Sequence, residues 1–176
     1  TTEKELYGAL QGAAECANNS VLRYSDDDRT ARGMGSTLTA AVIWDGCAHF
    51  VQVGDSRAYL YRKPDLVQLT TDQTLVNEMI ASGYLTREQA RTHPQRSMIT
   101  QALGSPQPLK AEMGKVMLRR GDRLLLCSDG LHGEIGDEHQ RIHGPELFTQ
   151  ADIGTDAGGR PGTRRPRQCD RAAVVP

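Results

Sequence analysis

Three short runs rich in β-branched and aromatic residues follow one another with very short connections, and this arrangement limits the possible folds more than any other feature. The runs are STLTAAVIW (residues 36–44), CAHFVQV (47–53) and RAYLYR (57–62). Asp45-Gly46 separates the first two runs, and this dipeptide is typical of a two-residue hairpin loop. A parallel pair would need a crossover of a dozen or more residues. The segment therefore predicts antiparallel strands.

The segments around these runs alternate between helical and strand patterns. Residues 3–22 and 73–92 have helical periodicity, and Thr86 with Gln89 forms a candidate capping box in the second segment. Residues 97–103 and 115–127 have strand character again. A chain of 176 residues suits one sizeable domain. The predicted fold class is α+β, with antiparallel sheets flanked by helices.

Charge and cysteine content argue against several classes of protein. The net charge of -1 gives no basic field to attract nucleic acid or an anionic membrane. No apolar run approaches the roughly 18 residues of a transmembrane helix, and residues 1–19 lack the order of a signal peptide. The cysteines are far apart in the sequence, which favours free thiols in a reducing cytosol; they are Cys16, Cys47, Cys127 and Cys169. We therefore expect a cytoplasmic protein that binds neither nucleic acid nor membrane.

Two aspartates follow hydrophobic strands in the same way. Asp129 comes after the apolar run Leu124–Cys127 and precedes Gly130, and Asp55 follows FVQVG. Asp and Gly are common in turns, so both residues could simply close a turn. Carboxylates on rigid strand ends are also suitable ligands for Mg²⁺ or Mn²⁺. The residues alone leave both interpretations open.

Other catalytic arrangements receive less support. Neither His93 nor His132 has an evident Asp or Ser partner in the sequence, so a hydrolytic triad is not indicated. The glycines of RGMGS precede a strand rather than a helix, which is the wrong context for a phosphate-binding loop.

Four longer stretches, taken together in their order and spacing, are more informative than any single motif. They are RGMGSTLTAAVI, VQVGDSRAYLYR, LTTDQTLVNEMIASGYLTREQARTHPQRSMITQALG and GDRLLLCSDGL. Together, over roughly residues 3–140, they resemble the PPM-type (protein phosphatase type 2C) metal-dependent serine/threonine protein phosphatases in their bacterial form. The resemblance implies a β-sandwich flanked by helices, with a binuclear Mn²⁺ or Mg²⁺ centre. It also implies hydrolysis of phosphoserine and phosphothreonine in proteins by a metal-activated water.

The resemblance also suggests roles for individual residues. Asp129 matches a core metal ligand of the family, with Gly130 beside it, and Asp55 matches an aspartate near the same centre. Asp170, before RAAVV, is the remaining candidate ligand. Residues 72–98 match a mobile flap beside the family's active site.

Some parts of the family pattern have no counterpart here. The DGMGG turn, whose aspartate bridges both metals, is not found, and Gly158-Gly159-Arg160 is not followed by the family's Asp-Asn. We therefore expect a fragment: a partial phosphatase domain in residues 1–143, then a divergent Gly/Pro/Arg-rich tail in residues 144–176. The activity of such a chain is expected to be weak or absent. The alternative is a catalytically inactive, phosphatase-like binding or regulatory module. Expected partners are phosphorylated proteins made by a serine/threonine kinase, and the expected state is a monomer.

Overall fold

The hairpin at Asp45-Gly46 organises the first of two antiparallel sheets. We describe a computed structural model, which defines residues 2–132 and 173–175. Trp44 lies opposite Cys47, so the loop has only two residues. Their φ angles are 48° for Asp45 and 71° for Gly46. Two successive positive φ angles are the geometry of a type I′ loop, whose twist matches that of paired strands.

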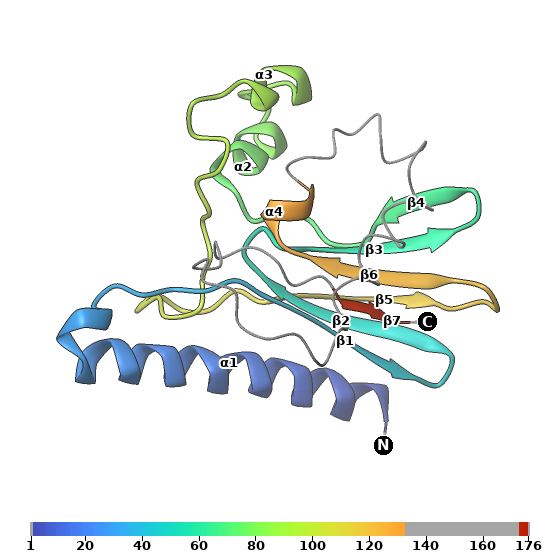
Figure 1. The fold of residues 1–176 in the computed structure, drawn as a ribbon, viewed down its shortest axis with the longest axis horizontal. Helices are drawn as coiled ribbons and strands as arrows, with labels where there is room; N and C mark the ends of the chain where they lie inside the picture. The colour runs from blue at the N-terminus through green and yellow to red at the C-terminus, as the bar shows by residue number, and fades with distance from the viewer. Residues whose placement is uncertain (1, 133–172, 176) are drawn as a thin grey trace, which may run out of the picture.

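The described strands form two sheets (Figure 1). The first has the order β1-β2-β5 and the second has the order β4-β3-β6-β7, and all pairings between the described strands are antiparallel. The α+β class and the antiparallel sheets are therefore confirmed. The elements, in chain order, are α1 (Glu3–Asp27), η1 (Arg29–Ala31), β1 (Leu38–Trp44), β2 (Cys47–Val53), β3 (Arg57–Arg62), β4 (Asp65–Gln68), α2 (Leu75–Ala81), α3 (Arg87–Arg91), β5 (Glu112–Met117), β6 (Arg123–Cys127), α4 (Asp129–His132) and β7 (Ala173–Val175).

Helix α1 covers the outer face of the first sheet (Figure 1). A capping box starts the helix, because Thr2 Oγ1 accepts from the Glu5 amide and the Glu5 carboxylate accepts from the Thr2 amide. Leu10 and Ala14 of the helix form a buried cluster with Val51 of β2. Helical periodicity thus predicted this helix, which continues to Asp27.

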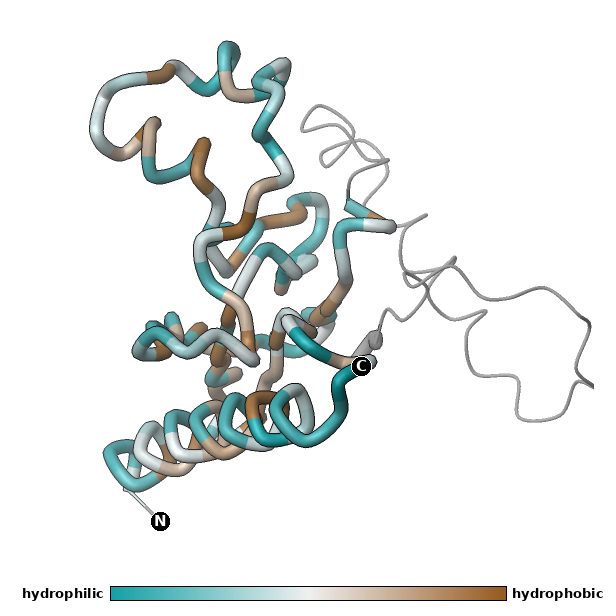
Figure 2. Tube along the Cα trace, turned by 90° about the vertical axis from the view of Figure 1, so that its left-hand side faces the viewer, coloured by the Kyte–Doolittle hydropathy of each residue, from teal (hydrophilic) through white to brown (hydrophobic). Residues whose placement is uncertain are grey.

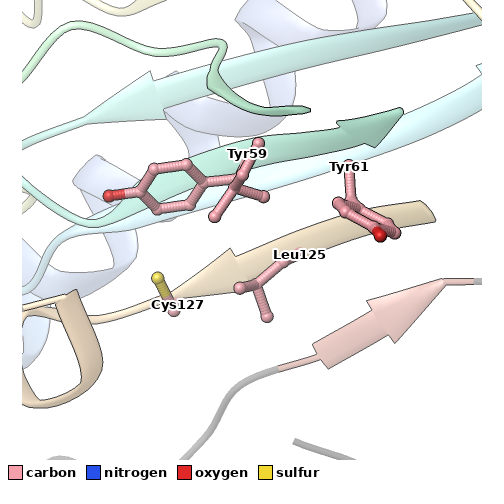
Figure 3. Close-up of a cluster of buried hydrophobic side chains, with 5 residues drawn as sticks. Tyr59, Tyr61, Leu125 and Cys127 are labelled. Carbon is pink, nitrogen blue, oxygen red and sulfur yellow. The ribbon is translucent and has the colours of Figure 1, made fainter. Parts of the chain in front are cut away.

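The two sheets meet through a small apolar cluster. Ala48 from β2 packs with Leu60 from β3 and Leu124 from β6. Side chains alternate along a strand, so Tyr59 and Tyr61 lie on the opposite face of β3 from Leu60. There they form a second buried cluster with Leu125 and Cys127 of β6 and with Leu66 (Figure 3). The strands next to the candidate site are therefore buried on both faces.

A long excursion leaves the sheets after β4 and returns before β5. It carries α2 and α3 and stands away from the layer of α1, at the top of Figures 1 and 2. Its two ends are held together: the Leu75 amide donates to the Met98 carbonyl at 2.9 Å, and the Thr100 amide donates to the Gln73 carbonyl at 2.8 Å. We call these paired ends, residues 73–75 and 98–100, the neck. The capping box predicted at Thr86 and Gln89 starts α3.

Two local predictions need correction. Residues 97–103 do not form a strand, since they make only isolated bridges to two different segments, Thr74↔Ile99 and Ser36↔Leu103. Strand β4 was missed, because it is only four residues long and follows Pro64 directly. Strand β7 lies in the predicted tail and pairs with β6. The rest of the tail, including Asp170, lies outside the described residues, and the division at residue 143 stays a prediction.

Candidate active site

The register of β3 and β6 brings two of the predicted ligands to the same end of one sheet. Arg57, the first residue of β3, lies opposite Cys127, the last residue of β6. Asp55 precedes Arg57 by two residues, and Asp129 follows Cys127 by two residues. In an antiparallel pair, the residues just before one strand and just after the other lie at the same edge. The sheet therefore places Asp55 and Asp129 at the same edge, where the charge of Asp129 acts on Asp55.

The electrostatics of Asp55 reflect this neighbourhood. Burial raises the pKa of its half-buried carboxyl, and the negative charges of Asp129 and Asp72 raise it further. The positive charge of Arg57 acts in the opposite direction. A carboxylate that is partly desolvated and repelled by other carboxylates is stabilised by an added cation. The site is thus electrostatically suited to a positive ligand.

The turn that carries Asp55 is rigid. Gly54 has a φ of +99°, and a Cβ atom added there would lie 2.5 Å from Thr37 Cγ2. The hydroxyls of Thr37 and Ser56 form a hydrogen bond of 2.7 Å, and Thr39 Oγ1 donates to the Ser56 carbonyl at 3.1 Å. The glycine lets Thr37, just before β1, approach closely, and the hydroxyl contacts hold Ser56, the residue that follows Asp55.

Asp129 and Gly130 open the short helix α4, whose last residue contacts the other half of the site. His132 Nε2 lies 3.0 Å from the carbonyl oxygen of Asp55. Burial lowers the pKa of His132, and the charge of Arg57 lowers it further. The neutral imidazole is therefore favoured, and it can donate one N–H to the Asp55 carbonyl. No sequence pattern indicated this contact, since the two residues are 77 positions apart.

The ion pair between Arg57 and Asp72 is a second feature that the sequence did not reveal. Arg57 Nη2 lies 2.6 Å from Asp72 Oδ2, and the two side chains are only 18% and 11% exposed. Burial lowers the pKa of Arg57, but the hydrogen bonds to Asp72 outweigh it, and the net shift is upward. The only available signal was the position of Asp72 at the start of the predicted flap segment.

The donor set suits a hard divalent cation but is small. Asp55 and Asp129 offer carboxylate oxygens, and Mg²⁺ is often held by one or two carboxylates plus waters. Among residues 2–132, no group of three or more His, Cys, Asp or Glu side chains is placed to hold a metal. The fourth predicted site residue, Asp170, lies outside the described part of the chain. The described residues therefore fit one cation position rather than a full binuclear centre.

Within the described residues, every helix is too short or too polar to span a bilayer.

Comparison with known proteins identifies the family. The family described as "Protein phosphatase 2C" matches residues 3–155. Protein phosphatase PhpP of Streptococcus pneumoniae serotype 2 is 42% identical over 123 residues, which are 70% of this chain and 50% of the relative. This chain thus spans about half of that relative's length.

Solved structures agree with the sequence match. The serine/threonine phosphatase of S. agalactiae superposes with a TM-score of 0.74 at 29% identity, covering 86% of this chain and 66% of the other. The catalytic domain of the phosphatase PstP, solved in complex with two manganese ions, gives a TM-score of 0.60 at 30% identity, covering 76% and 60%. With these likenesses and a family match over most of its length, the chain belongs to the protein phosphatase 2C family of bacterial, PPM-type serine/threonine phosphatases.

Proposed function

We propose that this chain supplies part of a metal-dependent phosphatase that removes phosphate from phosphoserine and phosphothreonine in proteins. The observation that carries the proposal is the convergence of Asp55 and Asp129 at the paired ends of β3 and β6. Family membership supports it, since the similar proteins are named as protein phosphatases and one was solved with two manganese ions.

Each residue of the site has a defined task in this proposal. Asp55 and Asp129 hold a Mn²⁺ or Mg²⁺ ion, with Gly130 allowing close approach at the start of α4. A bound divalent ion activates water and neutralises charge on the phosphoryl group. The Thr37, Thr39 and Ser56 contacts fix the Asp55 turn, and His132 holds the Asp55 carbonyl against α4. No protein nucleophile is needed.

We expect the activity of the 176-residue chain to be weak. Two carboxylates hold an ion less firmly than the larger ligand set of a two-metal site. Asp170 is the candidate for a further ligand, and residues 1–143 are the proposed phosphatase portion. A chimera that adds the unmatched part of the pneumococcal relative should therefore turn over faster by orders of magnitude.

The test measures Mn²⁺-dependent release of phosphate from a phosphothreonine peptide by the chain and by the chimera. Asp129→Asn and Asp55→Asn should each abolish the metal-dependent rate. Asp65→Asn should not, because Asp65 is exposed at the start of β4, at the other end of β3. Absence of metal-dependent turnover in both proteins would refute the phosphatase assignment and favour a catalytically silent module.

We further propose that the protein acts in the cytoplasm, as a monomer, on proteins phosphorylated by a serine/threonine kinase. Cys16, Cys47 and Cys127 are all free thiols in the described residues, which fits a reducing compartment. Cell fractionation and phosphoproteomics of a deletion strain would test the location and the substrate class.

A further inference from the structure

Every nitrogen of the Arg57 guanidinium has a hydrogen-bond acceptor. Nε donates to Asp72 Oδ1 at 2.8 Å and to Oδ2 at 3.0 Å, and Nη2 donates to Oδ2 at 2.6 Å. Nη1 donates to the Tyr59 hydroxyl at 2.9 Å. The bidentate contact of Nε and Nη2 with the Asp72 carboxylate fixes the orientation of the guanidinium plane as well as its position.

Asp72 is held in place independently of Arg57. Gln68 Nε2 donates to Asp72 Oδ1 at 2.9 Å, and Asn77 Nδ2 donates to the Asp72 carbonyl at 2.8 Å. The next residue, Gln73, exchanges two hydrogen bonds with Gly54: its amide donates to the Gly54 carbonyl at 2.9 Å, and its Oε1 accepts from the Gly54 amide at 2.8 Å. The Asp72 carboxylate is therefore held in position to accept from Arg57, and its neighbour Gln73 joins it to the turn that carries Asp55.

The charge of Arg57 is important because of its position. Arg57 is two residues from Asp55, and its positive charge acts on the Asp55 carboxyl. A guanidinium that turned toward Asp55 would form a charge-assisted hydrogen bond with it. Such a bond would compete with a divalent cation for the same carboxylate oxygens.

We propose that Asp72 is a positioning residue that acts through Arg57: it holds the guanidinium aside, so that Arg57 does not compete with a divalent cation for Asp55. The inference rests on the proposed function in one respect, the assignment of Asp55 as a cation ligand. Asp72 itself need not touch the metal. Removing Asp72 should therefore harm cation binding only while Arg57 is present.

The test is a double-mutant cycle on Mn²⁺ affinity, measured on the 176-residue chain by electron paramagnetic resonance of free Mn²⁺. Asp72→Asn should weaken binding by about tenfold, the effect expected from one new charge-assisted hydrogen bond to a ligand. Arg57→Gln alone should leave the affinity unchanged or raise it. The double variant should bind Mn²⁺ within about twofold of Arg57→Gln, since its competing cation is gone.

A second ion pair on the same strand provides the control. At the other end of β3, Arg62 contacts Asp122 through Nε at 2.9 Å and Nη2 at 2.6 Å. Asp122→Asn breaks a similar pair far from Asp55, so it should leave Mn²⁺ affinity within about twofold. Circular dichroism and urea unfolding verify that each variant is folded. If Asp72→Asn does not fold, the Mn²⁺ affinity of Arg57→Gln alone tests the proposal. A loss of affinity in that variant overturns it.

Two results would overturn the inference in folded variants. A double variant as weak as Asp72→Asn would show that Asp72 is a ligand or a purely structural residue, and an unchanged Asp72→Asn would show that Arg57 does not compete. If the wild-type chain binds no Mn²⁺, the ligand assignment of the proposed function fails instead. The position of the Arg57 guanidinium, followed by NMR contacts of its side-chain N–H groups without metal, then decides: it should lie beside Tyr59 in the wild type and move away from Tyr59 toward Asp55 in Asp72→Asn. No movement would refute the positioning role.

Discussion

Replacing Gly54 with alanine should destabilise the protein by roughly 2–6 kcal/mol, from two separable causes. A φ of +99° is unfavourable for any residue with a Cβ, at a cost of about 1–3 kcal/mol. The new Cβ would also lie 2.5 Å from Thr37 Cγ2 and 3.0 Å from Thr37 Cβ. Such overpacking adds about 1–3 kcal/mol. Urea unfolding, followed by the fluorescence of Trp44, the one tryptophan in the chain, measures the total.

Two further variants separate the backbone cost from the clash. Gly121 has a φ of +91° with no atom within 4 Å of an added Cβ, so Gly121→Ala should show the backbone cost alone. Thr37→Ser removes Cγ2 but keeps the hydroxyl that bonds Ser56. In that background, Gly54→Ala should cost about 1 kcal/mol less than in the wild type. Equal costs for Gly54→Ala in both backgrounds, or in Gly54→Ala and Gly121→Ala, would refute the close-approach argument.

Three other predictions concern the core, pH and local stability. Leu125 is 1% exposed, so Leu125→Ala should cost about 2–5 kcal/mol in urea unfolding, whereas Val67→Ala, at a position 50% exposed, should stay within about 0.5 kcal/mol. Burial lowers the pKa of His132 in the folded state, so the unfolded chain takes up the proton first as the pH drops. The free energy of unfolding should therefore fall as the pH drops through about 6.5. His132→Asn should flatten this pH dependence in unfolding measured from pH 7.5 to pH 5, and an unchanged slope would contradict the assignment. Amide hydrogen exchange should be faster in α2 and α3 than in β6, because α2 and α3 each have one buried residue; equal protection would show that the excursion is as stable as the sheets.

The sequence predicted those features that depend on neighbouring residues. The hairpin at Asp45-Gly46 follows from a dipeptide that tolerates two positive φ angles. The position of Asp55 and Asp129 at strand ends was also visible, because each follows a hydrophobic run. Their nearness, however, depends on the pairing of Arg57 with Cys127, which no local pattern encodes. Only the family resemblance suggested that they share a site.

Contacts between segments that are distant in the sequence could not be predicted from sequence patterns. The contact from His132 to Asp55 spans 77 residues and the pair of Arg57 with Asp72 spans 15, and neither has a spacing signal. The mistaken strand at residues 97–103 has the same origin. Its composition suits a strand, but Ile99 pairs with Thr74 while Leu103 pairs with Ser36, so no continuous ladder forms. Tertiary contacts thus decided between strand and extended loop.

The neck of the excursion allows the segment between residues 76 and 97 to change in length and sequence without moving the ends of the sheets. Backbone hydrogen bonds hold Leu75 next to Met98 and Gln73 next to Thr100, so the chain leaves the scaffold and re-enters it at neighbouring points. The entropy of closing a loop changes slowly with its length, by about 0.6 kcal/mol for each doubling. Insertions, deletions or whole replacements between residues 76 and 97 therefore change the entropic cost of closing this loop only slightly. Evolution can vary the surface that this segment presents to a partner while the strands that carry Asp55 and Asp129 stay fixed.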